Sequence, residues 1–102
     1  MVRKNEALSH DEKTDIYYDT WEQLEKLLSN SHIWYDIDHS KQYGSFFVIA
    51  VQIEGDWKHD HWYADELVKK EFGNRLVNID EYEIGDSHED YYVAVHEYMF
   101  DY

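Results

Sequence analysis

The last quarter of the chain, residues 76–102, carries eight carboxylates and no lysine or arginine. Over all 102 residues, 23 acidic side chains stand against 9 basic ones, which gives a net charge of −14. Like charges on a compact body repel one another and oppose folding. An acidic chain must therefore bury much apolar surface to fold, and here 43% of the residues are hydrophobic and 18% are aromatic. This balance predicts a packed domain with a strongly anionic surface.

The length is typical of a single domain. The chain has no cysteine and no proline, and its four glycines form no linker. We expect residues 1–14, which are polar and mixed in charge, to form a flexible N-terminal arm, and residues 15–102 to form one domain. The first residues lack the apolar segment of a secretory signal, and the longest apolar run, residues 46–51, is too short to span a membrane. We therefore expect a cytoplasmic protein.

Apolar spacing predicts two helices. Thr20-Trp-Glu-Gln23 matches the capping box and would begin the first helix, which Asn30 would end. Asp60 or a neighbour would cap the second helix, and Gly73 would follow its last turn.

Alternating or continuous apolar residues predict strands, one pair after each helix. Turns are expected at residues 40–45 and 85–87, where glycine occurs. The predicted strands span residues 32–38, 46–53, 76–84 and 91–100, with a possible short edge strand at 16–18.

The order αββαββ predicts an α+β fold, in which a four-stranded, mainly antiparallel sheet has both helices packed on one face. The opposite face would look outward. Both sets of alternating side chains in the last strand contain aromatic rings, so the sequence leaves two candidates for its outward row. One candidate comprises Tyr92, His96, Tyr98 and Phe100, and the other comprises Tyr91, Glu97 and Asp101. Either row would place rings beside carboxylates, as protein-binding surfaces often do.

The acidic C-terminal region is the main functional candidate. Alternate residues of a strand project from one face about 6.8 Å apart, a spacing comparable to that of phosphates along a nucleic acid. Glu81 and Glu83, continued by Asp86, Glu89 and Asp90 in the turn, would then imitate a phosphate track and dock in a basic groove. The alternative interpretation is an acidic face that only keeps the protein soluble.

The segment His59-Asp60-His61 is the main candidate for metal binding. Two histidines separated by one residue can supply two ligands, with Glu66, His39, His88 or His96 as a further one. No metalloprotease-type spacing accompanies them. The alternative is a solvated loop in which Asp60 caps the helix, and we expect no cofactor.

Two other groups of residues have ordinary structural explanations. Asp36 and Asp38, near His39, could act as an acid–base pair, but their alternation with apolar residues is typical of a half-buried strand. Trp21 is expected in the core. Trp34, Trp57 and Trp62 could anchor a partner's arginine or pack as half-buried side chains.

In size, acidity and tyrosine content, the chain resembles the small anti-defence proteins of phages and plasmids, which include anti-CRISPR and anti-restriction proteins that mimic DNA. The residues that carry this resemblance are Asp80-Glu-Tyr-Glu83, Asp86 to Tyr92 and Glu97 to Tyr102. It is a resemblance of composition, so no site is transferred residue by residue. It implies an inhibitor that blocks the nucleic-acid groove of a nuclease.

The sequence thus predicts a non-enzymatic inhibitor in the cytoplasm of a bacterial host. Its partner would be a positively charged nuclease, and it would bind neither nucleic acid nor membrane itself. The alternatives are an antitoxin-like or immunity-like module that neutralises a basic toxin, and a metal-dependent enzyme built on His59 and His61. The predicted partner-binding residues are Glu81, Tyr82, Glu83, Asp86, Glu89, Asp90, Tyr91, Tyr92, Glu97, Tyr98 and Asp101.

Overall fold

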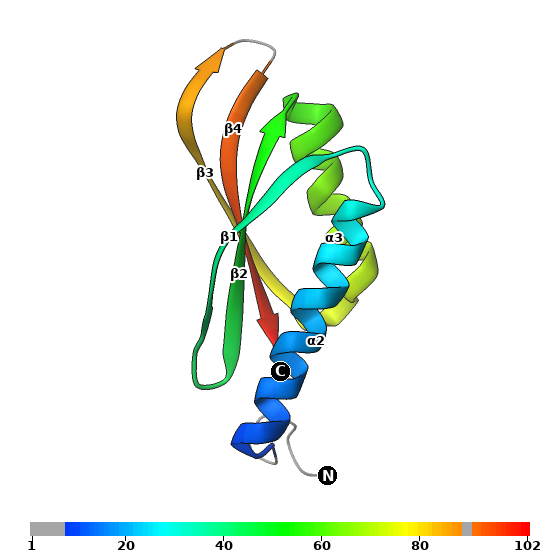
Figure 1. Ribbon diagram of the computed structural model, residues 1–102, viewed down its shortest axis with the longest axis vertical. Helices are drawn as coiled ribbons and strands as arrows, with labels where there is room; N and C mark the ends of the chain where they lie inside the picture. Colours follow the sequence, from blue (N-terminus) through cyan, green and yellow to red (C-terminus); the bar gives the residue numbers. More distant parts are fainter. Residues whose placement is uncertain (1–7, 89–90) are drawn as a thin grey trace.

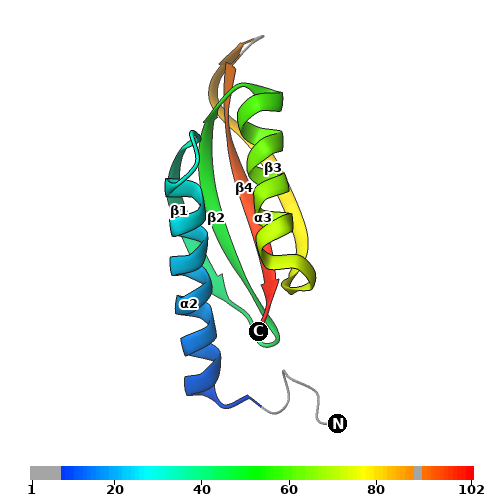
Figure 2. The ribbon, with the colours of Figure 1, turned by 90° about the vertical axis from the view of Figure 1, so that its right-hand side faces the viewer.

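A four-stranded antiparallel sheet forms one layer of the fold, and two helices form the other (Figures 1 and 2). The computed structural model describes residues 8–88 and 91–102. It confirms the predicted α+β class and the order αββαββ. The elements are α2 (His10–Ser29), β1 (Trp34–Gln42), β2 (Phe46–Gly55), the π-helical turn η1 (Trp57–Trp62), α3 (Tyr63–Phe72), the 3₁₀ turn η2 (Gly73–Arg75), β3 (Leu76–His88) and β4 (Tyr91–Asp101).

The strands lie in the order β1-β2-β4-β3, so β1 and β3 are the edges of the sheet. Every neighbouring pair is antiparallel. The run of apolar residues in β2 correctly predicted a central strand, which lies between β1 and β4 and buries one face against the helices. Both helices lie on the same side of the sheet (Figure 2), and the molecule extends over 49 × 22 × 19 Å.

The first helix begins eleven residues earlier than predicted, because its N-cap is Ser9 and not Thr20. Its capping box is Ser9-His-Asp-Glu12: the Ser9 hydroxyl accepts the amide of Glu12, and the Glu12 carboxylate accepts the amide of Ser9. Thr20 lies in the middle of α2, where its hydroxyl donates to the carbonyl of Ile16 at 2.7 Å. The predicted edge strand at 16–18 was therefore wrong, and so was the assignment of residues 10–14 to a flexible arm. Residues 1–7 of that arm lie outside the described residues.

Both hairpins also differ from the prediction. In β1 the pairing shifts between Ile37 and His39, so Asp38 forms a bulge and the strand continues to Gln42. In β3 the pairing shifts between Ile84 and His88, and the strand continues to His88. The predicted turn at 85–87 is therefore a break in the strand's register, where Gly85 has a φ of +69° that only glycine adopts readily.

The second helix is entered through η1, whose N-cap is Asp56 rather than Asp60, and α3 itself has no side-chain cap. The Asp56 carboxylate accepts the amides of Lys58 and His59 at 2.8 and 2.9 Å. Gly73 follows Phe72 at the end of α3, as predicted, but its φ of +54° and ψ of −127° differ from the αL conformation expected of a glycine at this position. This entry is important for the site because His61 lies in η1.

The core lies between the helices and one face of the sheet. From the helices it takes residues spaced four apart, as the helical repeat requires. In β4 the even-numbered residues point to the helices, which decides between the two candidate rows: Tyr91, Glu97 and Asp101 belong to the outward set. The main core residues are Leu24, Leu28, Ala64, Val68, Phe72, Phe47, Ile49, Val51, Ile53, Tyr98 and Phe100.

Candidate functional site

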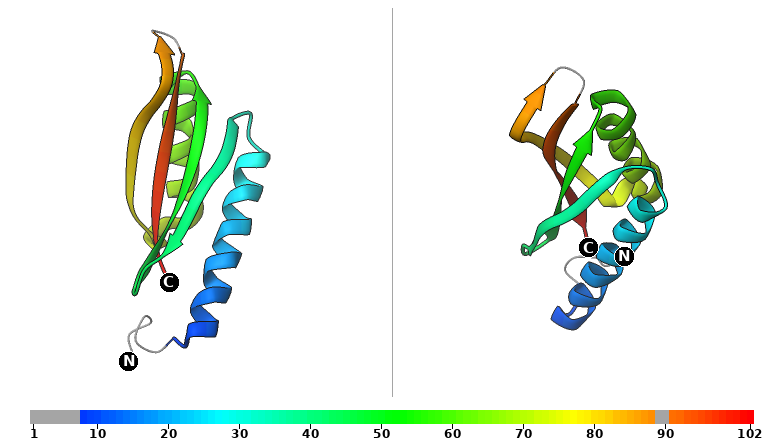
Figure 3. Two further views of the ribbon diagram at one scale, coloured as in Figure 1. Left: turned by 60° about the vertical axis from the view of Figure 1, so that its left-hand side comes forward. Right: turned by 45° about the horizontal axis from the view of Figure 1, so that its top comes forward.

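The sheet face opposite the helices, called here the outer face, is covered by no described helix (Figure 3). Strand pairing arranges its side chains in rows across β1, β2, β4 and β3. The rows are Trp34–Glu54–Val93–Ile84, then Asp36–Gln52–Val95–Tyr82, then His39–Ala50–Glu97–Asp80, and then Lys41–Val48–Met99–Asn78. The outer face therefore carries an apolar centre with carboxylates on all four strands.

Charge and aromatic rings are concentrated on this face. Its carboxylates are Asp36, Glu54, Asp80, Glu97 and Asp101, and Lys41 is the one lysine or arginine of its four rows. Trp34 and Tyr82 are exposed at 55% and 43% of their surface, although they stand on a structured sheet. Exposed rings beside carboxylates are suited to binding arginine side chains.

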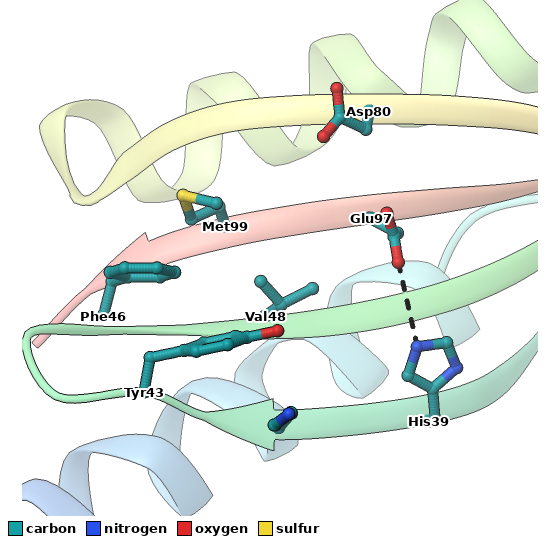
Figure 4. A pocket seen from close by; sticks show the side chains of 8 residues that line it. His39, Tyr43, Phe46, Val48, Asp80, Glu97 and Met99 are labelled. Carbon is teal, nitrogen blue, oxygen red and sulfur yellow. Dashed lines mark ion pairs between the residues drawn. The ribbon is translucent and has the colours of Figure 1, made fainter.

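A hollow of about 330 Å³ opens on the outer face. Its apolar floor holds Val48 and Met99, and Tyr43 stacks on Phe46 with ring centroids 4.7 Å apart (Figure 4). The remaining lining residues are polar: His39, Lys41, Asp80 and Glu97. A long cationic side chain matches this lining, because its stem is apolar and its head is positive.

The acids of the hollow face one another. Asp80 on β3 and Glu97 on β4 are direct cross-strand partners, and like charges in such a pair destabilise a sheet. Two basic side chains, His39 and Lys41, line the same hollow. His39 reaches the Glu97 carboxylate at 3.8 Å and also the Asp38 carboxylate at 2.8 Å, whereas the Lys41 ammonium lies over the Tyr43 ring, 5.2 Å from its centroid.

The structure divides the predicted partner-binding residues between the two sheet faces. Tyr82, Tyr91, Glu97 and Asp101 belong to the outer face, whereas Glu81, Glu83, Tyr92 and Tyr98 lie on the helix side. Tyr98 is fully buried and Tyr92 is 8% exposed, so neither ring can supply the predicted contact area. The side chains of Asp86, Glu89 and Asp90 lie outside the described residues. Glu81 and Glu83 are exposed on the helix side of β3, so the track predicted from them and the outer face are two different surfaces.

On the helix side, a buried histidine pair joins η1 to the sheet. His61 and His96, exposed at 1% and 0%, approach each other with Nδ1 of His61 2.8 Å from Nε2 of His96. The outer nitrogens of the two rings also have partners: Nε2 of His61 lies 3.1 Å from the carbonyl of Tyr92, and Nδ1 of His96 lies 2.8 Å from Oδ1 of Asp65. The His61 ring stacks on the Tyr92 ring at a centroid distance of 3.9 Å.

Two carboxylates complete this histidine cluster. Glu81 places Oε1 3.4 Å from Nε2 of His96, and its Oε2 accepts the Tyr92 hydroxyl at 3.2 Å. Asp65 accepts the Tyr98 hydroxyl at 2.8 Å. Among the described residues, His61, Glu81 and His96 form a group that could hold a metal ion. The cluster is held by η1, α3, β3 and β4.

Burial shifts the pKa values of His61, Tyr92 and Tyr98 in this cluster. It lowers the pKa of His61 below the ordinary histidine value, against the opposing effect of the Tyr92 carbonyl. Burial likewise raises the pKa of the Tyr98 hydroxyl, and the charge of Asp65 raises it further. The pKa of the Tyr92 hydroxyl is likewise raised, first by burial and then by the charge of Glu81. Both phenols therefore remain protonated donors over the whole neutral range.

The predicted metal segment behaves differently from the prediction. His59 is exposed and lines a surface hollow with Trp57, Lys58 and Trp62, whereas His61 turns into the interior. The structure thus pairs His61 with His96 and not with His59. Sequence reasoning missed Asp65 and the placement of Glu81 beside the rings, because these residues come from separate elements with no shared local pattern.

The comparisons with known proteins add no assignment. No protein-family model, curated protein or solved structure matches this chain. No helix among the described residues combines the length and apolarity needed to cross a membrane. The fold and the two groups of residues above therefore define the class: an α+β protein with an acidic, aromatic outer face and a buried histidine cluster.

Proposed function

We propose that this chain is a non-enzymatic inhibitor that inserts its outer face into the basic nucleic-acid groove of another protein, such as a CRISPR effector or a restriction enzyme in a bacterial cytoplasm. The observation that carries the proposal is the facing pair Asp80 and Glu97 beside an aromatic hollow. A cross-strand pair of like charges costs stability in the free protein. An arginine from a partner would relieve that repulsion, so the cost is recovered on binding.

The pattern of the carboxylates supports a nucleic-acid groove as the target. Asp36 and Asp80 lie on the two edge strands of the outer face, in neighbouring rows, and these strands are separated by three strand spacings or roughly 14 Å. Phosphates across the major groove of DNA are separated by a similar width, about 12 Å. A groove lined by arginine and lysine for two phosphate rows would therefore meet one carboxylate on each edge strand, with Glu54 and Glu97 on the two strands between them.

The hollow supplies specificity beyond charge. A partner arginine could place its guanidinium between Asp80 and Glu97 and lay its stem on Met99 and the Tyr43–Phe46 stack. Arginine is well suited to this position, because its planar head binds carboxylates and also stacks on rings. Trp34 and Tyr82 would add contact area on either side.

The mechanism is competition with the natural nucleic acid. A net charge of −14 steers the chain toward a positive groove and excludes it from binding nucleic acid itself. Inhibition should weaken as the salt concentration rises, because the Debye length falls from about 10 Å at 0.1 M to about 3 Å at 1 M. A hydrophobic, charge-independent interface would show little of this dependence.

The test compares two charge reversals of equal size. Asp36→Lys with Asp80→Lys changes the outer face, while Asp15→Lys with Glu22→Lys changes exposed positions on α2. Both variants alter the net charge by the same amount. Displacement of labelled DNA from candidate nucleases, followed by fluorescence anisotropy across a salt series, should be lost in the first variant and kept in the second. Equal inhibition by both variants, or equal loss, would contradict docking through the outer face.

A basic toxin is the second candidate partner, since the same face would fit it. Capture of bound proteins on immobilised wild-type chain, with the outer-face variant as the matched control, separates the two. Retention of a nucleic-acid enzyme supports the groove proposal. Retention of a small basic toxin, with no DNA displacement from any nuclease, replaces it.

A further inference from the structure

The hydrogen bonds of the histidine cluster fix which ring nitrogens carry protons. A backbone carbonyl only accepts hydrogen bonds, so Nε2 of His61 must donate to Tyr92. An ionised carboxylate also only accepts, so Nδ1 of His96 must donate to Asp65. A neutral imidazole has one N–H, and in both rings it is now assigned. The two remaining nitrogens, Nδ1 of His61 and Nε2 of His96, are therefore both lone pairs.

These two lone pairs face each other at 2.8 Å inside the protein. Neither can donate to the other, and both rings are shielded from water. Two buried acceptors without a donor are unfavourable, so a cation is required between them. Glu81 directs a third lone pair to the same place, with Oε1 3.4 Å from Nε2 of His96.

We propose that His61, His96 and Glu81 bind one divalent transition-metal ion of the zinc class. Two imidazoles and one glutamate form a ligand set that zinc uses in proteins, with a fourth position left for water. Bonds of about 2.0–2.1 Å in a tetrahedron separate ligand atoms by about 3.3 Å. The Glu81–His96 distance already meets this value, and the two rings need to separate by about half an ångström from 2.8 Å.

The residues around the three ligands have the arrangement of a metal site's outer shell. Metal-binding histidines almost always donate their other N–H to a carboxylate or a carbonyl, as His96 does to Asp65 and His61 does to Tyr92. The carboxylate ligand is held too, by the Tyr92 hydroxyl on the second oxygen of Glu81. All three ligands are therefore oriented before an ion arrives.

Charge balance favours a divalent ion over a shared proton. Asp65 and Glu81 give the cluster two negative charges, and a single proton between the rings would leave one of them without compensation. A divalent ion neutralises both. Asp65 and Glu81, which both contact the His96 ring, also line an open hollow on the surface.

This inference is independent of the proposed inhibitor function, and it is tested on the full chain after treatment with a chelator. Titration with Co²⁺ should give one saturable equivalent with the visible absorption of a tetrahedral site, and Zn²⁺ should displace it. Asp65→Asn should weaken binding by about 10–100-fold, as loss of an outer-shell carboxylate does in other sites. Glu81→Gln should weaken it by at least about as much, because it removes a charged ligand.

His59→Asn is the matched control, since His59 is two residues from His61 but exposed. It should bind Co²⁺ like the wild type. His96→Gln should bind no Co²⁺. If that variant fails to fold, the Co²⁺ affinities of Asp65→Asn and Glu81→Gln test the proposal instead, because these two residues lie at the margin of the cluster. The proposal is overturned if the folded wild type takes up no stoichiometric Co²⁺ and ¹⁵N spectra show one proton shared between the rings. Binding that is lost in His59→Asn but kept in Glu81→Gln overturns it equally.

Discussion

The carboxylate of Asp60 lies against the backbone of Gly55, where its Oδ2 accepts the amide of Asp56 at 2.7 Å. A Cβ on residue 55 would stand 2.2 Å from that same oxygen, and the φ of +149° already disfavours any other residue. This contact holds the entry to η1 and therefore the position of His61.

Gly55→Ala should consequently destabilise the protein by about 1–3 kcal/mol, through backbone strain and displacement of Asp60. Urea denaturation followed by tryptophan fluorescence measures the change. Gly44→Ala is the control, because a Cβ at Gly44 meets no atom within 4 Å. Equal stability of the two alanine variants would show that the Asp60 contact does not constrain residue 55.

Because Asp80 and Glu97 face each other, we expect that removing their charges will stabilise the free protein but weaken its binding to a basic partner. The double variant Asp80→Asn with Glu97→Gln keeps the side-chain shapes and removes the repulsion, so it should gain about 0.2–1 kcal/mol of unfolding free energy. The same variant should lose affinity for a basic partner. Thermal unfolding at low salt measures the gain, and DNA displacement measures the loss. A variant that is less stable than the wild type would mean that these carboxylates are already neutralised within the free protein.

The Asp56 carboxylate caps η1, so the stability that this cap contributes should depend on pH. Hydrogen bonds from the backbone amides of His59 and Lys58 lower the pKa of its carboxyl below the ordinary value. A carboxyl whose pKa is lower in the folded state stabilises the fold above the unfolded-state pKa, and this stabilisation is lost as the pH falls through the folded pKa. A carboxyl-detected NMR titration should show Asp56 titrating below the value of an unfolded peptide. Asp56→Asn should remove this component from the pH dependence of unfolding, and an unchanged dependence would exclude the cap as its source.

The hydrogen bond from the Tyr98 hydroxyl to Asp65 is expected to stabilise the fold, and its contribution can be measured. Tyr98→Phe removes the hydroxyl that donates to Asp65 and leaves the ring in place, so it should cost about 1.5–3 kcal/mol, as hydrogen bonds to charged groups do. Tyr63→Phe, at an exposed position on α3, should change stability by less than about 0.5 kcal/mol. Chemical denaturation of both variants measures the difference. Equal effects would indicate that Asp65 keeps its hydrogen bonds through water.

The strands and the class of fold could be predicted from the sequence. Which side chains of β4 face the helices and which face outward could not. Continuous apolar residues marked β2 as central. In β4, however, Tyr98 and Tyr91 are the same residue type on opposite faces, so alternation alone could not tell which ring is buried. The bulge at Asp38 and the register shift after Ile84 depend on strand pairing, which no local pattern specifies. The start of the first helix was within reach of the sequence, because Ser9-His-Asp-Glu12 fits the capping-box pattern, but the prediction rested on the similar pattern at Thr20 alone.

The histidine cluster could not be predicted for a different reason. His61 and His96 are 35 residues apart, and their contact depends on the entry of η1 and on the inward face of β4. The pattern His59-Asp60-His61 indicated the right segment, but a π-helical turn sends the two side chains to different environments. Only the packed structure brings Glu81 and Asp65 to the same rings.

The open edges of the sheet have a consequence for how copies of this chain meet. β1 and β3 leave unpaired backbone groups at the two borders of the sheet, which is the usual starting point for ribbon-like self-assembly. Asp36 and Asp38 stand along one border, and Asp80, Glu81 and Glu83 stand along the other. Two chains that approached border to border would bring these anions together, so the charge proposed here to attract a basic partner would also oppose growth of the sheet into an aggregate.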